Sequence, residues 1–305
     1  MRIRPRCSVC LFHRGFKEIQ LATDDPTLQF QVLQAIIDLF ANELNENAVS
    51  AVLGTKRDRI IRQMTNCPDP YEEHKKKSNE LALKLKPPLE QALSLESDPY
   101  KRFRFATLAA IVGNILEFDI VEHSLDLEKP DYIQSLIDRA EQELAIDHIK
   151  EIFQLIQAVQ EVLFLTDNAG EIVFDKLLIR ELLQLDVSVI VAVKESPVLN
   201  DATLEDAEVA NLISLSQQDS RLQVITTGTD HVGLILDEIS DPFASVFNNA
   251  EFIIAKGMGY YETLAETNLP KPIAYLFRTK CSSVAEDVGV ELGKNLALLR
   301  SINCK

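Results

Sequence analysis

The segment Glu161–Asp175 is the feature that most constrains how this chain folds. A short run rich in β-forming residues, Val162–Thr166, ends abruptly at Asp167 and Asn168, and Gly170 then turns the chain into a helical pattern. A strand followed by polar side chains and a glycine turn is typical of open α/β sheets, whose ligands bind beyond the carboxyl ends of the strands. Carboxylate and amide oxygens at that edge suit a hard divalent cation, and the first amides of the helix favour phosphate.

The second half of the chain alternates β-rich runs with helical stretches. The run from 187 to 193 is apolar at both alternating sets of positions. Strands that are covered on both faces have this pattern, so we expect an α/β fold with a mostly parallel sheet and helices on each side. The predicted strands are Val162–Thr166, Val187–Val193, Leu222–Thr226, Phe252–Ala255 and Ile273–Phe277.

The first half has a helical pattern almost throughout. Pro26 and Pro70 each follow an aspartate, an arrangement typical of the start of a helix. Pro130 is likewise expected in the first turn of a helix that runs towards Leu144. The pair Pro87-Pro88 is expected to end one helix and begin another, because proline lacks the N–H that continues the helix.

The chain is predicted to contain two domains. At 305 residues it is long enough for a large buried core. The pattern changes from helical to β-rich near residue 155, and no low-complexity linker separates the two parts. We therefore predict an N-terminal all-helical domain over residues 1–155, packed on a Rossmann-like α/β domain over residues 156–305.

Composition and charge exclude several classes of function. The content of 46% hydrophobic and 26% charged residues is that of a soluble globular protein. A formal net charge of −16 repels nucleic acids and anionic membranes at long range. We find neither an apolar stretch of the ~18 residues that a membrane span needs nor the pattern of a secretory signal. Five cysteines do not indicate a disulfide framework, so we expect a cytoplasmic protein of unknown oligomeric state that binds neither nucleic acid nor membrane.

Four segments of the second half place polar or glycine residues directly after a predicted strand. The carboxyl ends of parallel strands lie at one edge of a sheet, so these segments are expected to converge. The first two offer carboxylates and amides for a cation, and the last two offer lysines and exposed backbone amides for an anion. The four segments are 167–171, 194–203, 256–262 and 278–281.

Each segment also has a purely structural interpretation. Asp167-Asn168 after a strand is common turn chemistry, and Asp201 is well placed to cap a helix. Gly257 and Gly259 are a weak phosphate signal, since most such glycine pairs form turns. The lysines of the last two segments would, singly, be solvated surface charges. The repetition of the pattern at four strand ends favours a common site.

These motifs resemble those of the damage-control phosphatase family, long catalogued as a domain of unknown function, and most closely its mainly prokaryotic subfamily I. The matching segments of the second half are DNAGEIVFD, LNDATLEDA and KGMGYYETL. The resemblance covers nearly the whole chain. In the helical half it extends over Cys7-x-x-Cys10, Asp69-Pro70-Tyr71, Lys75, Asn79 and Gly113-Asn114.

The resemblance implies a metal-dependent phosphatase with a helical N-terminal domain and a Rossmann-like domain. Its substrate would be a small phosphorylated metabolite, such as a sugar phosphate. The catalytic residues and metal ligands of the family fall on Asp167, Asn168 and Asp201. Three protein oxygens would leave a hexacoordinate Mn²⁺, Co²⁺, Ni²⁺ or Mg²⁺ about three positions for water and phosphate. The residues expected to contact substrate or phosphate are Glu171, Asn114, Lys256, Gly257, Gly259 and Lys280.

Several interpretations remain open. The Asn114 amide could instead make a buried hydrogen bond between the domains. Some family members have asparagine where this chain has Tyr260. Cys7 and Cys10 have the spacing of a zinc half-site, but no second cysteine pair accompanies them.

Two other functions compete with the phosphatase. One is an S-adenosylmethionine-dependent carboxyl methyltransferase, a role claimed for a more distant branch of the family. The first strand and turn lack the Gly-x-Gly spacing of a dinucleotide-type turn, which argues against this role. The other is a non-catalytic ligand-binding protein built on a Rossmann-like sheet.

Overall fold

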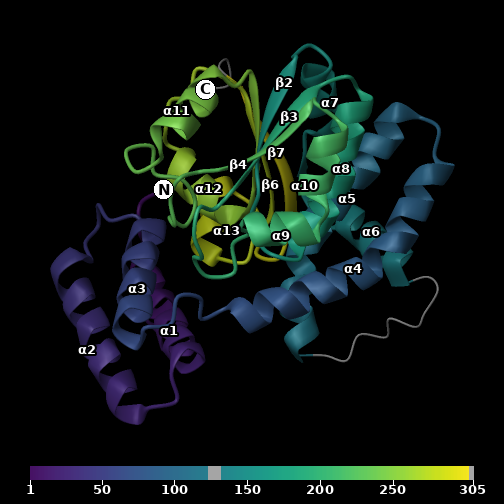
Figure 1. Ribbon diagram of the computed structural model, residues 1–305. Helices are drawn as coiled ribbons and strands as arrows, with labels where there is room; N and C mark the ends of the chain where they lie inside the picture. The colour runs from purple at the N-terminus through teal and green to yellow at the C-terminus, as the bar shows by residue number, and fades with distance from the viewer. Residues whose placement is uncertain (123–131, 302–305) are drawn as a thin grey trace.

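A seven-stranded sheet forms the centre of the computed structural model, which describes residues 1–122 and 132–301. The strands follow the order β1-β7-β6-β5-β2-β3-β4 (Figure 1). Strands β2 to β6 run parallel to one another, whereas β7 pairs antiparallel with β6 and parallel with β1. The strands are β1 (Leu144–Asp147), β2 (Glu161–Leu165), β3 (Ser188–Val193), β4 (Leu222–Thr226), β5 (Phe252–Lys256), β6 (Ile273–Arg278) and β7 (Asn295–Arg300).

The central strands are buried on both faces, as their continuous apolar runs predict. Val162 and Phe164 of β2 belong to one hydrophobic cluster, and Leu163 and Leu165 belong to another on the opposite face. The order β4-β3-β2-β5-β6 reverses at β2, which is the topology of a Rossmann-like sheet. The predicted mostly parallel α/β fold with an N-terminal helical region is confirmed.

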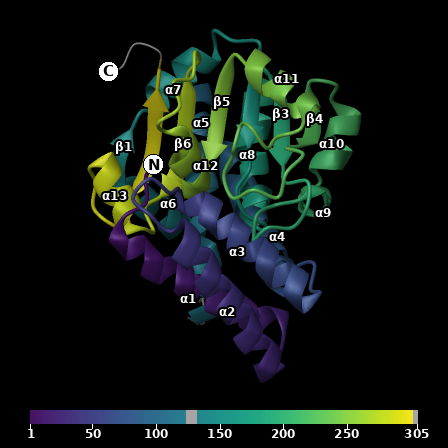
Figure 2. The same cartoon turned by 90° about the vertical axis from the view of Figure 1, so that its left-hand side faces the viewer.

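Helices cover both faces of the sheet, and a three-helix bundle extends beyond the carboxyl ends of strands β2 to β6 (Figures 1 and 2). The first face packs against α4 (Glu72–Leu95), α5 (Pro99–Glu122), α6 (Tyr132–Gln142), α7 (Ile149–Ile156), α8 (Glu171–Gln184), α9 (Leu204–Val209) and α10 (Leu212–Gln218). The second face packs against α11 (Asp241–Asn249), α12 (Gly257–Leu264) and α13 (Ser282–Val288). The bundle comprises α1 (Pro5–Ala22), α2 (Pro26–Glu43) and α3 (Ser50–Thr65), with a small apolar core of its own. Among the described residues, no helix is long and apolar enough to cross a membrane.

The break expected at Pro87-Pro88 is wrong, because α4 continues through both prolines to Leu95. Each proline removes one backbone hydrogen bond and costs about 3 kcal/mol in a helix interior. Leu85, Leu89 and Leu93 of the same helix are buried in the large core on both sides of the prolines. Their burial keeps the helix continuous despite this cost.

The edge strand β1 and its neighbour β7 were not expected from the sequence. Strand β1 has four residues that are alternately half-buried and exposed, directly after α6 ends at Gln142. It pairs with β7, so residues before the predicted boundary at 155 contribute to the sheet. The division into residues 1–155 and 156–305 stays a prediction. Pro130 lies outside the described residues.

Helices α5 and α8 approach each other closely at Gly113. A Cβ atom built on this glycine would lie 2.9 Å from Phe174 Cδ2 and 3.2 Å from Glu171 Cα. Contacts this short require backbone movement, because Glu171 starts α8. Gly113 therefore allows the helical half to pack directly on the helix that follows the first motif.

We expect Gly113→Ala to lower the stability of the protein by about 1–3 kcal/mol, since the added methyl overpacks the α5–α8 contact. The matched control is Gly54→Ala in α3, where the nearest atom to the new Cβ is 3.8 Å away. That substitution should stabilise by about 0.5–1 kcal/mol through helix propensity. Urea unfolding measures both changes. Equal effects of the two variants would contradict the close approach at Gly113.

Candidate metal and phosphate site

The loops after β2 and β3 are joined directly through their backbones. Ala202 N donates to Asp167 O at 2.8 Å, and Ala169 N donates to the carbonyl of Asn200 at 2.9 Å. Asn168 and Asp201 form an isolated antiparallel bridge between the two loops. The structure therefore brings together the three residues expected to be metal ligands, although 33 positions separate Asn168 from Asp201 in the chain.

Asp201 is 5% exposed and lies beside the buried ammonium of Lys194, whose Nζ is 3.6 Å from Asp201 Oδ2. Burial raises the pKa of the Asp201 carboxyl, and the charges of Lys194, Lys75 and Arg14 oppose this increase. Lys194 was not expected to be a site residue, although its position directly after β3 is a usable sequence signal. The alternative interpretation of Asp201 as a helix cap is wrong, since Thr203 is the N-cap of α9.

Lys256 and Glu171 bind each other within the protein, and their expected contact with substrate or phosphate stays a prediction. The Lys256 ammonium is fully buried and donates to Ala110 O at 2.8 Å, to Asp175 Oδ1 at 2.7 Å and to the Glu171 carboxylate. Burial would lower the pKa of Lys256, but Asp175 and Glu171 outweigh it and hold that pKa above its ordinary value. The second Glu171 oxygen accepts from Asn168 Nδ2 at 3.1 Å. Lys256 thus fixes Glu171, and Glu171 in turn fixes the side chain of Asn168.

The Asn168 amide is held by two carboxylates. Its Nδ2 also donates to Asp167 Oδ2 at 2.9 Å, so both acceptors lie at the nitrogen end of the amide. The carbonyl oxygen of Asn168 is at the opposite end. This oxygen takes part in neither of the two hydrogen bonds, and its role as a metal ligand stays a prediction.

Gly257 is needed for the position of Asp167. Its φ is +80°, and a Cβ there would lie 2.0 Å from Asp167 Oδ2. Gly259 and Gly233 also approach closely: a Cβ on Gly233 would lie 2.3 Å from Gly259 O, and a Cβ on Gly259 would lie 3.1 Å from Gly233 N. The first amides of α12 have no carbonyl partner within the helix, as at any helix start. Lys280 is half-buried at the same edge, and its backbone N–H donates to Met258 Sδ at 3.4 Å.

Asn79 of α4 joins the helical half to both loops. Its Oδ1 accepts from Gly170 N at 2.6 Å, and its Nδ2 donates to Asp206 Oδ1 at 2.8 Å. Asp206 in turn forms a capping box with Thr203. The side chain of Asn114, expected to contact substrate, lies outside the described residues.

A buried ionic cluster of α1 and α3 reaches the Asp201 loop. Arg57 and Glu18 are paired at 3.0 Å, and neither side chain is more than 1% exposed. The fully buried Asp58 binds Arg62 Nε at 2.7 Å and is 3.5 Å from the backbone N of Leu199, which has a φ of +46°. Nothing in the sequence marks this cluster, because it depends on how the helices pack. It holds a strained residue two positions before Asp201.

The loop between β4 and α11 extends this support to Lys194. Asp230 in that loop binds Arg62 and accepts from Arg59 Nε at 3.0 Å. The next residues, His231 and Gly233, offer their carbonyls to Lys194 Nζ at 2.8 and 2.6 Å. Arginines of the three-helix bundle thus fix the loop that positions the lysine beside Asp201.

Tyr260 closes the site from the side of α12. The residue is 1% exposed, and Lys194 Nζ lies 4.7 Å from the centroid of its ring. Burial raises the pKa of the Tyr260 hydroxyl well above its ordinary value, and the negative charges of Asp201 and Asp167 raise it further. Its buried hydroxyl has no hydrogen-bond partner in the described part of the chain.

The cysteine pair does not form a metal site with other residues of the described chain. Cys7 is buried, with its Sγ 3.4 Å from Ser283 Oγ, whereas Cys10 is exposed. Among the side chains that the structure describes, no group of three or more histidines, cysteines, aspartates or glutamates could hold a metal. The predicted site differs from such a group, because one of its three ligands is an amide.

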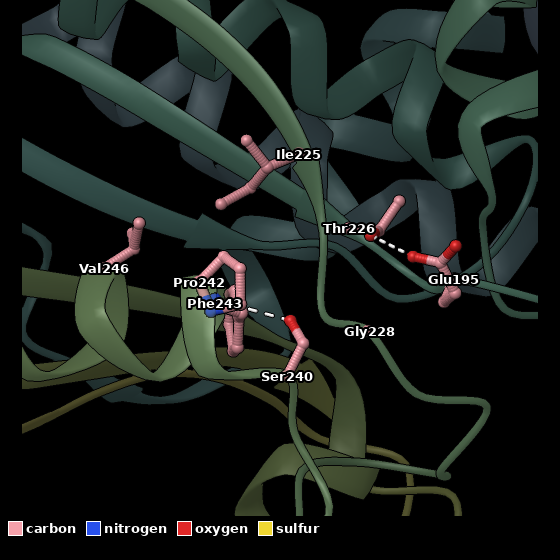
Figure 3. Close-up of a pocket in the computed structure, with 8 residues that line it drawn as sticks. All are labelled: Glu195, Ile225, Thr226, Gly228, Ser240, Pro242, Phe243 and Val246. Atoms are coloured by element: carbon pink, nitrogen blue, oxygen red, sulfur yellow. Dashed lines mark hydrogen bonds between the residues drawn. The ribbon is translucent and has the colours of Figure 1, made fainter.

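A separate cavity of about 510 Å³ opens next to the ends of β3 and β4 (Figure 3). Its polar groups bind one another: Thr226 donates to the Glu195 carboxylate, and Ser240 Oγ accepts from Phe243 N at 3.4 Å. None of the predicted site residues lines it. The lining residues are Glu195, Ile225, Thr226, Gly228, Ser240, Pro242, Phe243 and Val246.

The sequence model of the damage-control phosphatase ARMT1-like domain matches residues 3–296. The chain belongs to this family. An uncharacterized protein of Methanocaldococcus jannaschii is 36% identical over 98% of this chain and 96% of its own length. A damage-control phosphatase of Archaeoglobus fulgidus is 33% identical over 97% of this chain and 99% of its own length.

A solved structure supports the same family assignment. The crystal structure of a DUF89 family protein from Pyrococcus horikoshii matches with a TM-score of 0.86 and 32% identity. The match covers 98% of this chain and 99% of that protein. The family predicted from the strand-end motifs is thus confirmed, and the name of the Archaeoglobus relative agrees with the predicted phosphatase function.

Replacing Gly257 by alanine should displace the Asp167 carboxylate. We expect Gly257→Ala to weaken binding of Mn²⁺ at least ~10-fold, measured by calorimetry, as is typical when a metal ligand loses its support. Gly289→Ala is the matched control: Gly289 has a φ of +82°, and no atom lies within 4 Å of its added Cβ. Both variants carry a backbone cost of about 1–2 kcal/mol, visible in urea unfolding. Equal Mn²⁺ affinities would contradict the role of Gly257.

Glu18 should make folding stability depend on pH. Burial raises its pKa to about 9 from an ordinary value of 4.5, and Arg57 opposes this increase. The folded state therefore retains a proton that the unfolded chain loses, so stability decreases as the pH rises from about 4.5 to about 9, by at most ~1.4 kcal/mol per pH unit.

Urea unfolding between pH 5 and pH 9 tests this assignment. Glu18→Gln removes the titrating group, so its stability should fall less steeply across that range than the wild type's. Glu73→Gln, at a side chain that is 73% exposed on α4, serves as the control and should retain the wild-type slope. A Glu18→Gln variant with the wild-type slope would refute the assignment.

Proposed function

We propose that the protein is a metal-dependent phosphatase that hydrolyses small phosphate monoesters such as sugar phosphates, in the manner of metabolite damage control. The observation that carries this proposal is the direct pairing of the Asp167-Asn168 loop with the Asp201 loop. It gathers two carboxylates and an amide at the carboxyl edge of the sheet, where α/β folds bind their ligands. The names of the damage-control phosphatases of Archaeoglobus fulgidus and Pyrococcus horikoshii support it.

The donor set fits a divalent cation. Asp167, Asn168 and Asp201 offer oxygen atoms, which Mg²⁺ and Mn²⁺ prefer. Burial disfavours the charge of Asp201, so a cation beside this carboxylate would relieve the cost of its ionisation. When bound, a cation at these residues would neutralise charge on the phosphoryl oxygens, and Mn²⁺, Co²⁺, Ni²⁺ and Mg²⁺ are all candidates.

The surroundings of the site suit a phosphate group. Lys75 of α4 and Arg14 of α1 lie close enough to lower the pKa of Asp201, so positive charge faces the site from the helical half. Lys280 contributes a further cation at the strand edge. Asp167 is more exposed than Asp201, so it is the carboxylate better placed to meet phosphorus or an attacking water.

The test is phosphate release from a panel of sugar phosphates, after chelation and after addition of each of the four cations. We expect release only with metal, and Asp201→Asn to reduce kcat/KM at least ~100-fold, because an electrostatic contribution of several kcal/mol is lost. The same variant should lose Mn²⁺ affinity in calorimetry. Asp24→Asn, at an exposed carboxylate before α2, should behave as the wild type.

The alternative functions give different results in the same experiment. Methyl transfer from S-adenosylmethionine without phosphate release would contradict the proposal in favour of the methyltransferase. Absence of both reactions across the panel would favour a non-catalytic ligand-binding protein.

A further inference from the structure

The Tyr260 hydroxyl is a hydrogen-bond donor placed at the site without an acceptor. It is buried, and its oxygen has no hydrogen-bond partner in the described residues. The two carboxylates of the site, Asp167 and Asp201, act on it electrostatically but lie beyond hydrogen-bond reach. Beneath its ring is Lys194, whose ammonium can only donate. A buried donor in this position destabilises the free protein unless a ligand satisfies it.

The neighbouring tyrosines show that this arrangement is particular to Tyr260. Tyr261, the next residue on α12, donates its hydroxyl to Asp287 Oδ2 at 2.8 Å and accepts from Arg300 Nη2 at 3.0 Å. Tyr275 of β6 has a buried hydroxyl that also lacks a partner among the described residues, but its ring packs edge-on against Tyr261, with 5.3 Å between the ring centroids. Among these three, only Tyr260 packs its ring on Lys194, whose Nζ is 3.6 Å from Asp201 Oδ2, and only its hydroxyl is affected by the charges of both Asp167 and Asp201.

We propose that Tyr260 is a substrate-contact residue whose hydroxyl donates a hydrogen bond to a phosphoryl oxygen held between Asp167 and Asp201. This inference rests on the proposed phosphatase function. A phosphate dianion supplies the acceptor that the free site lacks, and the hydroxyl keeps its proton beside the two carboxylates. The contact is independent of the sugar, because it involves the group that all phosphate monoesters share.

Tyr260→Phe removes the hydroxyl and preserves the ring that packs on Lys194. We expect kcat/KM to fall about 10- to 100-fold for every sugar phosphate that the wild type hydrolyses, as for loss of a hydrogen bond to a charged group. Inhibition by inorganic phosphate should weaken by a similar factor. The melting temperature of the free protein should stay the same or rise, because an unsatisfied donor has been removed.

Tyr261→Phe and Tyr275→Phe are the matched controls, and both should retain the wild-type kcat/KM and phosphate inhibition. Unchanged kinetics of Tyr260→Phe would overturn the inference, and so would a marked loss of its thermal stability, which indicates a structural role. An effect that varies with the sugar while phosphate inhibition is unchanged would also overturn it. These outcomes leave the phosphatase function intact.

Failure of the proposed function itself is recognised separately. If the wild type hydrolyses no substrate of the panel, binding of inorganic phosphate in the presence of Mn²⁺ is measured by calorimetry for the wild type and Tyr260→Phe. Weaker binding by the variant, about 10-fold or more, supports the contact. Equal affinities, or no phosphate binding by either protein, refute it.

Discussion

The buried ammonium of Lys256 is the interaction on which the geometry of the site depends. A fully buried charge is tolerated only when it is paired and hydrogen-bonded. Lys256 ends β5, and its acceptors come from α5, through Ala110 O, and from α8, through Glu171 and Asp175. One side chain thus fixes a strand and two helices relative to each other. Glu171 also accepts a hydrogen bond from Asn168, so the segment 167–171 is held in place before any ligand binds.

The helical half is part of the site and not an appendage to it. Asn79 of α4 forms hydrogen bonds with Gly170, in the loop after β2, and with Asp206, in the helix α9 that follows β3. Asp58 of α3 supports the residue that leads into Asn200-Asp201, and Asp230 links the same helix to the loop that holds Lys194. Buried ionic groups contribute little net stability on average, so their concentration between the bundle and the sheet fits a role in positioning. Movement of α3 would therefore displace the loop that carries Asp201.

The sequence predicts well those features that depend on a local pattern of residues, and it misses those that depend on tertiary contacts. Strands such as β3 are apolar on both faces, a pattern that few other structures share, and the meeting of Asp167 with Asp201 follows from the shared edge of parallel strands. Strand β1 is short and half-exposed, so its four residues resemble the end of a helix. The local sequence does not show whether the Lys256 ammonium points into the protein or towards solvent. Its direction is determined by packing against α5 and α8. Asp58 was missed because its role depends entirely on tertiary contacts.

Local and overall charge oppose each other in this protein. The net charge of −16 repels a phosphorylated substrate, but screening at physiological ionic strength limits that repulsion to about 8 Å. Lys194 Nζ lies 3.6 Å from Asp201 Oδ2, and the charges of Lys194, Lys75 and Arg14 all reduce the cost of ionising this carboxyl. Lys194 is neutralised in part by the carboxylates it faces, so the site itself needs a further positive charge before it can hold a phosphate dianion. The proposed divalent cation would supply that charge beside Asp201, and it would allow an acidic protein to bind an anionic substrate.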